Sequence, residues 1–271
     1  MIITISDIYS LLIGLCIGSF LNVVIYRIPE GISIVSPRSF CPDCKKEIKY
    51  TQNVPVISWL IQKGKCSYCG SYINIRYPII ESLTAILFFV FSKSSPQFYN
   101  FNQNMFVENI FSWLFLSILL AISFIDLEHF WIPQVLINFG YFGGLLNLIV
   151  SGIINKKFFY IYLFKGLAGA FLTYVLFELL RLLAKKIYKR DALGKGDSKL
   201  VSMMALWLGP LGISLGIGIA YVVAAIFLLI KLQFKTIKKG QMIPFAPFLS
   251  IGGLVVWFFG NEFLLSFIYG I

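Results

Sequence analysis

Residues 106–126 read FVENIFSWLFLSILLAISFID, a mainly apolar run that ends in an aspartate. A bilayer-spanning helix needs about 20 apolar residues, so this run predicts a transmembrane helix with Asp126 at its end. The composition extends this prediction to the whole chain, because 58% of the residues are hydrophobic and 13% are charged. With a mean hydropathy of +0.84, the sequence is typical of a polytopic membrane protein.

Eight segments are apolar enough to be predicted as membrane spans. They cover residues 8–28, 79–93, 106–125, 134–153, 158–183, 198–210, 211–231 and 244–270. The first has no basic start and no small-residue cleavage motif, so we expect an anchor that is not cleaved. The predicted fold class is an all-α membrane protein with about eight transmembrane helices.

Lysine and arginine are concentrated in alternate loops of this arrangement. They gather in residues 27–77, 181–199 and 231–239. Because basic loops stay in the cytoplasm, the pattern predicts both termini outside, with Asp126 and Asp197 facing the cytoplasm. The net charge of +11 then reflects topology and attraction to anionic lipids of the bilayer. No basic-aromatic pattern indicates a nucleic-acid partner.

The soluble segment 29–77 contains two cysteine pairs, which are Cys41 with Cys44 and Cys66 with Cys69. Each pair has the spacing at which two thiolates bind one ion, so the four predict a structural Zn²⁺ site of the zinc-ribbon type. A reducing cytoplasm disfavours disulfides, and free or redox-active thiols are the remaining alternative. Metal binding would supply folding free energy to a segment with few apolar residues.

Two aspartates at predicted span ends are the candidate catalytic groups. Asp126 ends the third span, and Asp197 lies in residues 194–200, GKGDSKL. Two carboxylates held close together share a proton, so one can activate water while the other polarises a carbonyl. The alternative is that Asp197 caps a helix and Asp126 is a polar end residue. Gly194 and Gly196 would allow a tight turn or the close approach of an extended substrate strand.

Other catalytic arrangements find little support. His129 is the single histidine of the chain, and no GxSxG, HExxH or phosphate-binding loop accompanies it. Lys199 would favour the ionised form of Asp197 if the two side chains met. A lysine whose stem lies along apolar surface at the interface is the simpler interpretation.

Several motifs are specific in combination. They read GSFLNVVIYRIP at 18–29, PRSFCPDC at 37–44, PVISWL at 55–60, GKC at 64–66, RYPIIE at 76–81, Ile-Pro at 132–133, GKGDSKL at 194–200 and PFAPF at 244–248. Together with Asp126 they resemble the prepilin peptidases, the type IV leader peptidase family of bacterial membrane aspartic proteases. The GxGD motif alone would be weaker, because presenilin-like proteases share it.

The resemblance implies two activities. The aspartates that match Asp126 and Asp197 would cut the short basic leader of type IV prepilins, or of type II secretion pseudopilins, after a glycine. Members with the cysteine loop also transfer a methyl group from S-adenosylmethionine to the new N-terminal amine, usually of phenylalanine. Candidates for this methyl-transfer site, by position around the loop, are Glu47, Gly64, Lys65 and Glu81.

The implied location is the bacterial cytoplasmic (inner) membrane, with the active site facing the cytoplasm. The expected domains are a first span at 1–28, a zinc-binding insert associated with methyl transfer at 29–77, and a membrane-embedded peptidase core at 78–271. Two other functions stay open: a membrane transporter with a carboxylate relay, and a non-catalytic scaffold that displays a zinc ribbon.

The sequence departs from the family pattern at three positions. Gln134 stands where an aspartate usually follows Ile-Pro, Ala246 replaces the glycine of the Pro-Phe-Gly-Pro-Phe pattern, and Ser198 replaces a small aliphatic residue. None of these is Asp126 or Asp197. The departures therefore bear on fine specificity and leave the expected reaction class unchanged.

Overall fold

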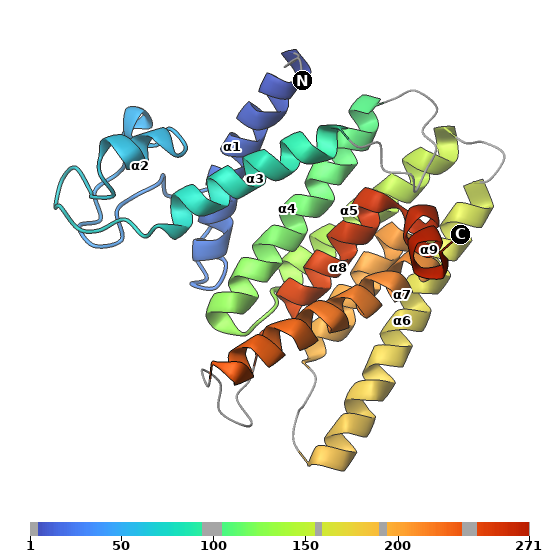
Figure 1. Ribbon diagram of the computed structural model, residues 1–271. Coiled ribbons are helices and arrows are strands. Elements are labelled where there is room, and N and C mark those ends of the chain that lie inside the picture. Colours follow the sequence, from blue (N-terminus) through green and yellow to red (C-terminus); the bar gives the residue numbers. More distant parts are fainter. Residues whose placement is uncertain (1–4, 94–104, 155–158, 190–193, 235–242, 271) are drawn as a thin grey trace. The chain divides into compact units, whose positions relative to one another are not determined.

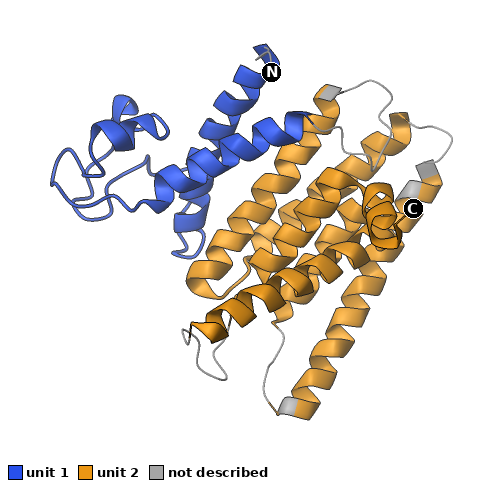
Figure 2. Cartoon of the chain, viewed as in Figure 1, with its two compact units in different colours: residues 1–94 blue, residues 95–271 orange. Residues whose placement is uncertain are grey.

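The computed structural model describes residues 5–93, 105–154, 159–189, 194–234 and 243–270, and its helices are labelled in Figure 1. The chain divides into two compact units, residues 1–94 and 95–271, which Figure 2 shows in different colours. Apart from two isolated bridge pairs, the regular structure of the described residues is helical. The predicted all-α class is confirmed.

The first unit is built on two helices that pack closely against each other. Their bounds are Ile5–Arg27 for α1 and Arg76–Lys93 for α3. A Cβ added at Gly14 would lie 2.6 Å from Ala85 Cα, and one added at Gly18 would lie 2.7 Å from Glu81 Cα. The two pairs run in opposite sequence order, so the helices are antiparallel. Glycines on one face allow this close approach of two backbones.

A small insert connects α1 to α3. It contains the 3₁₀-helix η1 (Tyr50–Gln52), the short helix α2 (Ile57–Ile61), and the bridge pairs Phe40↔Glu47 and Lys65↔Tyr72. Each bridge closes a turn that carries one cysteine pair. Between residues 29 and 75, only Cys41, Ser58 and Gly64 are buried. The insert therefore has almost no apolar core, as the sequence predicted.

The second unit contains six labelled helices. They are α4 (Met105–His129), α5 (Gln134–Ile154), α6 (Phe159–Tyr188), α7 (Lys195–Gln233), α8 (Ala246–Phe259) and α9 (Asn261–Tyr269). The fully buried Trp207 lies at the centre of their core. Its ring stacks on Phe115 with 4.8 Å between centroids and meets Trp257 edge-on at 5.8 Å. Its Nε1 donates to the Gly140 carbonyl at 2.9 Å, so the indole N–H is not left unpaired.

The long helix α7 is interrupted at Gly209, where φ is 69° and ψ is 174°. Positive φ is easily adopted only by glycine, and Pro210 cannot donate the next backbone hydrogen bond. The chain reverses at this point, so both ends of α7 lie at the same end of the second unit in Figure 1. The break coincides with the predicted boundary between the segments 198–210 and 211–231.

The eight predicted spans are not confirmed. Among the described residues, five helices are long and apolar enough to cross a membrane: α1, α4, α5, α6 and α7. The segment predicted at 79–93 corresponds to α3, which carries Arg76, Glu81 and Lys93 and is not one of the five. The segment predicted at 244–270 is not one continuous helix, because α8 and α9 are bent by 97°. This bend lies at Gly260, whose φ is 77°.

Truncation of Trp207 should destabilise the second unit strongly. Trp207→Ala removes a fully buried ring and leaves the Gly140 carbonyl unpaired, which should cost about 3–5 kcal/mol. The measurement is the thermal unfolding midpoint of the purified full chain in detergent. Trp131→Ala is the matched control, since the Trp131 side chain is 47% exposed. Equal shifts for the two variants would show that Trp207 is not the centre of the core.

Candidate active sites

Asp126 lies in the last turn of α4 and is 6% exposed. Its Oδ2 accepts a hydrogen bond from the backbone N–H of Ala246 at 3.1 Å. Ala246 is the first residue of α8, where an N–H has no partner within its own helix. Asp126 thus pairs with a backbone N–H at the start of a helix that lies 120 residues away in the sequence. This contact fixes the carboxylate between α4 and α8.

Asp197 lies in the first turn of α7, and its carboxylate interacts electrostatically with that of Asp126. The N-cap of α7 is Gly194, whose backbone N–H bonds to the Asp197 carboxylate. Asp197 is therefore the third helical residue, which reaches back to the N-cap as in half of a capping box. A Cβ at Gly194 would lie 3.0 Å from Asp197 Oδ2, so glycine leaves room for this turn.

The capping and catalytic interpretations of Asp197 are thus compatible. Capping holds the carboxylate at the start of α7, and the fold places Asp126 near it. The pair lies where three helix ends meet, which are the end of α4 and the starts of α7 and α8. Such a pair can bind a water molecule and a peptide carbonyl at the same time.

Further groups surround the aspartate pair. Tyr221 interacts electrostatically with Asp197, and its ring centroid lies 5.4 Å from that of Phe245. The reversal of α7 at Gly209 brings Tyr221 back to this place. A Cβ at Gly196 would lie 3.0 Å from the side chain of Ile132, which explains a small residue at Gly196 by packing. Sequence reasoning missed Tyr221, because the predicted boundary between residues 210 and 211 does not show which residue of the following segment lies near Asp197.

Lys199 is directed to the amide of Gln134. Its Nζ donates to Gln134 Oε1 at 2.5 Å, and the Gln134 amide donates onward to Asn138 Oδ1 at 2.8 Å. Gln134 is the position at which the sequence departs from the expected aspartate. Lys199 thus contacts a neutral side chain, which agrees with the simpler interpretation of an interfacial lysine.

The four cysteines of the insert form one cluster. The Sγ atoms of Cys41, Cys44, Cys66 and Cys69 all lie within 4.8 Å of one another. Zn–S bonds of about 2.3 Å in a tetrahedral site separate the sulfurs by about 3.8 Å. The Cys41 and Cys69 sulfurs are 3.9 Å apart. Four thiols at this spacing fit a structural zinc ion, with no position left open for a substrate.

The Ser71 hydroxyl supports the cluster. It lies 3.1 Å from Cys69 Sγ and 3.7 Å from Cys41 Sγ. Its hydrogen bond, together with the Ser71 backbone N–H, lowers the pKa of the Cys69 thiol to about 6. A thiolate is the form that binds zinc, so this hydrogen bond prepares Cys69 as a ligand.

The four candidates for methyl transfer are not brought together. Glu47 and Lys65 are exposed, and the Lys65 ammonium lies over the Tyr72 ring at 5.2 Å. Gly64 has a φ of +66°, and an added Cβ would meet the Trp59 ring at 2.9 Å. Glu81 alone lines a cavity of the first unit. It is 6% exposed, and its Oε2 accepts the Val56 backbone N–H at 2.7 Å.

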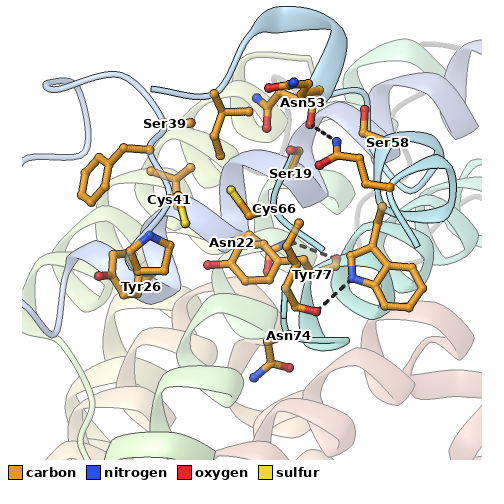
Figure 3. A pocket seen from close by; sticks show the side chains of 18 of the residues that line it. Ser19, Asn22, Tyr26, Ser39, Cys41, Asn53, Ser58, Cys66, Asn74 and Tyr77 are labelled. Atoms are coloured by element: carbon orange, nitrogen blue, oxygen red, sulfur yellow. Dashed lines mark hydrogen bonds between the residues drawn. The ribbon is translucent and has the colours of Figure 1, made fainter. Parts of the chain in front are cut away.

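This cavity has a volume of about 450 Å³, within the range of about 300–1,000 Å³ that is typical of small-molecule sites. Its walls come from α1, α2, α3 and the cysteine-bearing turns, as Figure 3 shows. Aromatic side chains of Tyr26, Trp59 and Tyr77 line it together with the polar Ser19 and Asn22. Sequence reasoning did not single out Ser19 and Asn22, although their spacing of three places them on one face of α1.

Comparison with known proteins assigns both parts of the chain. Residues 12–94 match the bacterial Peptidase A24 N-terminal domain, and residues 113–229 match the type IV leader peptidase family. No solved structure matches.

Curated relatives align over most of the chain. A prepilin leader peptidase/N-methyltransferase of Myxococcus xanthus is 33% identical over 82% of this chain and 63% of its own length. A type 4 prepilin-like proteins leader peptide-processing enzyme of Escherichia coli is 33% identical over 89% of both chains. A prepilin leader peptidase/N-methyltransferase of Legionella pneumophila is 32% identical over 93% of this chain and 91% of its own length.

The cysteine cluster should bind one zinc ion per chain. Cys66→Ser removes one of four thiolates and should lower the zinc content of the purified protein several-fold, because the remaining ligands cannot close the tetrahedron. Elemental analysis of the full chain measures this. Cys16→Ser is the matched control, since Cys16 lies in α1, away from the cluster. Full zinc content in Cys66→Ser would contradict the assignment.

Zinc binding should also depend on pH. The pKa of the Cys69 thiol is lowered to about 6, whereas desolvation and the neighbouring thiols raise the pKa of Cys44 to about 11. Protons therefore compete with the metal for the four thiolates, and zinc rebinding by metal-stripped protein should weaken progressively as the pH falls from 7.5 to 5. Titration with a zinc-sensitive dye at several pH values tests this, and a flat profile between pH 5 and 7.5 would contradict it.

Proposed function

The chain belongs to the type IV leader peptidase family, and we propose that it is a membrane aspartic endopeptidase that removes the leader of type IV prepilins or pseudopilins. The observation that carries this proposal is the approach of two aspartates that lie 71 positions apart, Asp126 and Asp197, at the meeting of three helix ends. The named activities of the relatives supply the substrate class.

The proposed mechanism follows from the pair. Two carboxylates held close together cannot both ionise easily, so they share one proton. The ionised carboxylate takes a proton from water, whose oxygen attacks the carbonyl carbon of the scissile bond. The protonated carboxylate donates to the carbonyl oxygen. As the C–N bond breaks, the carboxyl that took the proton from water gives it to the leaving amine, and one hydroxyl proton of the tetrahedral intermediate returns to the other carboxylate. The Ala246 and Gly194 N–H groups keep the two side chains in place.

We further propose that cleavage takes place after a glycine on the cytoplasmic side of the bacterial inner membrane, with both chain termini outside. The bias of lysine and arginine toward alternate loops supports this orientation. The leader of such substrates is short and basic, and the carboxylates near the pair would attract it. Among the described residues these include Glu128, in the last turn of α4 beside His129.

A second activity is proposed for the first unit, namely methylation of the new N-terminal amine. S-adenosylmethionine, when bound, supplies an electrophilic methyl group. The cavity lined by Glu81 has a suitable volume, and its aromatic walls suit a planar base or a phenylalanine ring. The role of the Glu81 carboxylate would be to hold the substrate ammonium or to accept its proton, so that a neutral amine attacks. The names of the relatives support this activity.

The transporter and scaffold functions are less well supported. A carboxylate relay requires acids within the spans and often has broken helices in two symmetric halves, whereas Asp126 and Asp197 lie at helix ends. A scaffold would not need two carboxylates placed together at the end of α4 and the start of α7.

Removing either carboxyl of the pair should abolish leader cleavage. Asp126→Asn and Asp197→Asn cannot share a proton in the required way, so we expect cleavage to fall by about 10²–10⁴-fold. The assay is processing of a full-length prepilin by membranes or detergent-purified protein, with mass spectrometry of the mature N-terminus. Glu262→Gln is the matched control, because Glu262 is an exposed carboxylate at the start of α9 and has no role in the proposed mechanism. Cleavage at the parent rate by either Asp variant would show that the two aspartates are not a catalytic pair and serve only to pair N–H groups at helix starts.

Methylation should depend on Glu81 and not on Glu47. In Glu81→Gln the buried carboxylate is lost, and we expect methyl transfer to fall by about 10²-fold or more while leader cleavage persists. Glu47→Gln changes an exposed carboxylate outside the cavity and should leave both activities unchanged. Mass spectrometry of the mature product detects the added methyl group. Normal methylation by Glu81→Gln would exclude Glu81 from the methyl-transfer site.

A further inference from the structure

Asn22 presents an unpaired acceptor at the wall of the cavity in the first unit. Its Nδ2 donates to the Tyr77 carbonyl at 3.0 Å and to the Gly18 carbonyl at 3.3 Å. Its Oδ1 has no hydrogen-bond partner in the described part of the chain, although the side chain is only 2% exposed. A buried acceptor without a partner is unfavourable unless a ligand or water supplies a donor.

The contact between α1 and α3 places a carboxylate near this acceptor. Gly18 lies against the backbone of Glu81, and Asn22, one turn further along α1, bonds to Tyr77, one turn earlier on α3. Ser19, on the same face of α1, hydrogen-bonds to the Glu81 carboxylate. The polar side chains of Ser19, Asn22 and Glu81 all line the cavity. Figure 3 shows Ser19, Asn22 and Tyr77 around it.

The cationic side chains of the cavity wall have other contacts. The Arg27 guanidinium donates to the Ser33 carbonyl at 2.8 Å and to the Arg38 carbonyl at 3.2 Å. The Arg76 guanidinium lies 5.2 Å from the centroid of the Tyr77 ring. The end of the cavity near Asn22 and Glu81 thus combines an unpaired neutral acceptor with a buried carboxylate.

We propose that Asn22 Oδ1 and the Glu81 carboxylate together bind a primary α-ammonium group in this cavity. An ammonium offers three N–H donors and a positive charge, which match an amide oxygen and a carboxylate. Two molecules of the proposed reaction carry such a group, namely the new N-terminus of the cut substrate and the amino-acid portion of the methyl donor. The inference rests on the methyl-transfer activity proposed above, and it assigns Asn22 the role of a positioning residue for that amine.

Binding measurements without turnover test the proposal. The probes are a synthetic peptide beginning with phenylalanine, S-adenosylhomocysteine, and the N-acetyl derivative of each, added to zinc-loaded full chain in detergent. Acetylation removes the charge and two of the three N–H donors, so it should weaken binding of the true ligand by about tenfold or more. The ligand that shows this discrimination identifies which of the two amines Asn22 binds.

Variants then connect the discrimination to Asn22. Asn22→Leu should bind the free amine about tenfold more weakly and lose the preference over the acetylated form. Asn22→Asp keeps an acceptor and should retain the preference, which covers the case in which Asn22→Leu does not fold. Asn53→Leu is the matched control, because it makes the same amide-to-Leu change at an exposed position of the cavity wall that has no part in the proposed ammonium site. Thermal unfolding and zinc content check that each variant is folded.

Two results would overturn the proposal. One is equal affinity of the parent for the free and acetylated forms of both ligands. The other is a folded Asn22→Leu variant that keeps the full preference for the free amine. Failure of the proposed function would look different, because the parent would then neither cut nor methylate a full-length prepilin, whatever its affinity for amines.

Discussion

Backbone N–H and C=O groups cannot remain unpaired in hydrocarbon, and most of this structure follows from that constraint. It requires helices wherever the chain lies in the membrane, and it leaves unpaired N–H groups only in the first turn of each helix. Both proposed catalytic carboxylates bond to such groups. Asp126 accepts from the first N–H of α8, and Asp197 accepts from the N-cap of its own helix α7. The groups that complete the helix starts are therefore also those available for chemistry.

The same constraint explains why glycines decide the local architecture. Gly209 and Gly260 adopt positive φ and divide apolar stretches that would otherwise continue as straight helices. The first reverses α7, which brings Tyr221 near Asp197, and the second turns α9 by 97° away from α8. In the first unit, Gly14 and Gly18 let α1 approach α3 so closely that Asn22 reaches a backbone carbonyl of the other helix.

The two units solve the problem of stability differently. The second has an aromatic core around Trp207, with the indole N–H paired to Gly140. The insert of the first has only three buried residues between positions 29 and 75, and four thiols at the spacing of a zinc site stand where a core would otherwise be needed. The cavity that this insert lines together with α1 and α3 is bordered by polar as well as aromatic side chains.

The sequence by itself determined the all-helical class, the family and the grouping of the four cysteines, because hydropathy, motif and ligand spacing are local properties. It also singled out Asp126 and Asp197 as the candidate pair. It did not determine the number of continuous spans, since apolar composition placed a boundary next to Gly209 but could not show that Gly260 breaks the last predicted span. Nor did it separate Glu81 from Glu47, Gly64 and Lys65, or indicate Asn22 and Tyr221. Those distinctions depend on burial and on contacts between residues distant in the sequence, and only the packing of helix against helix decides them.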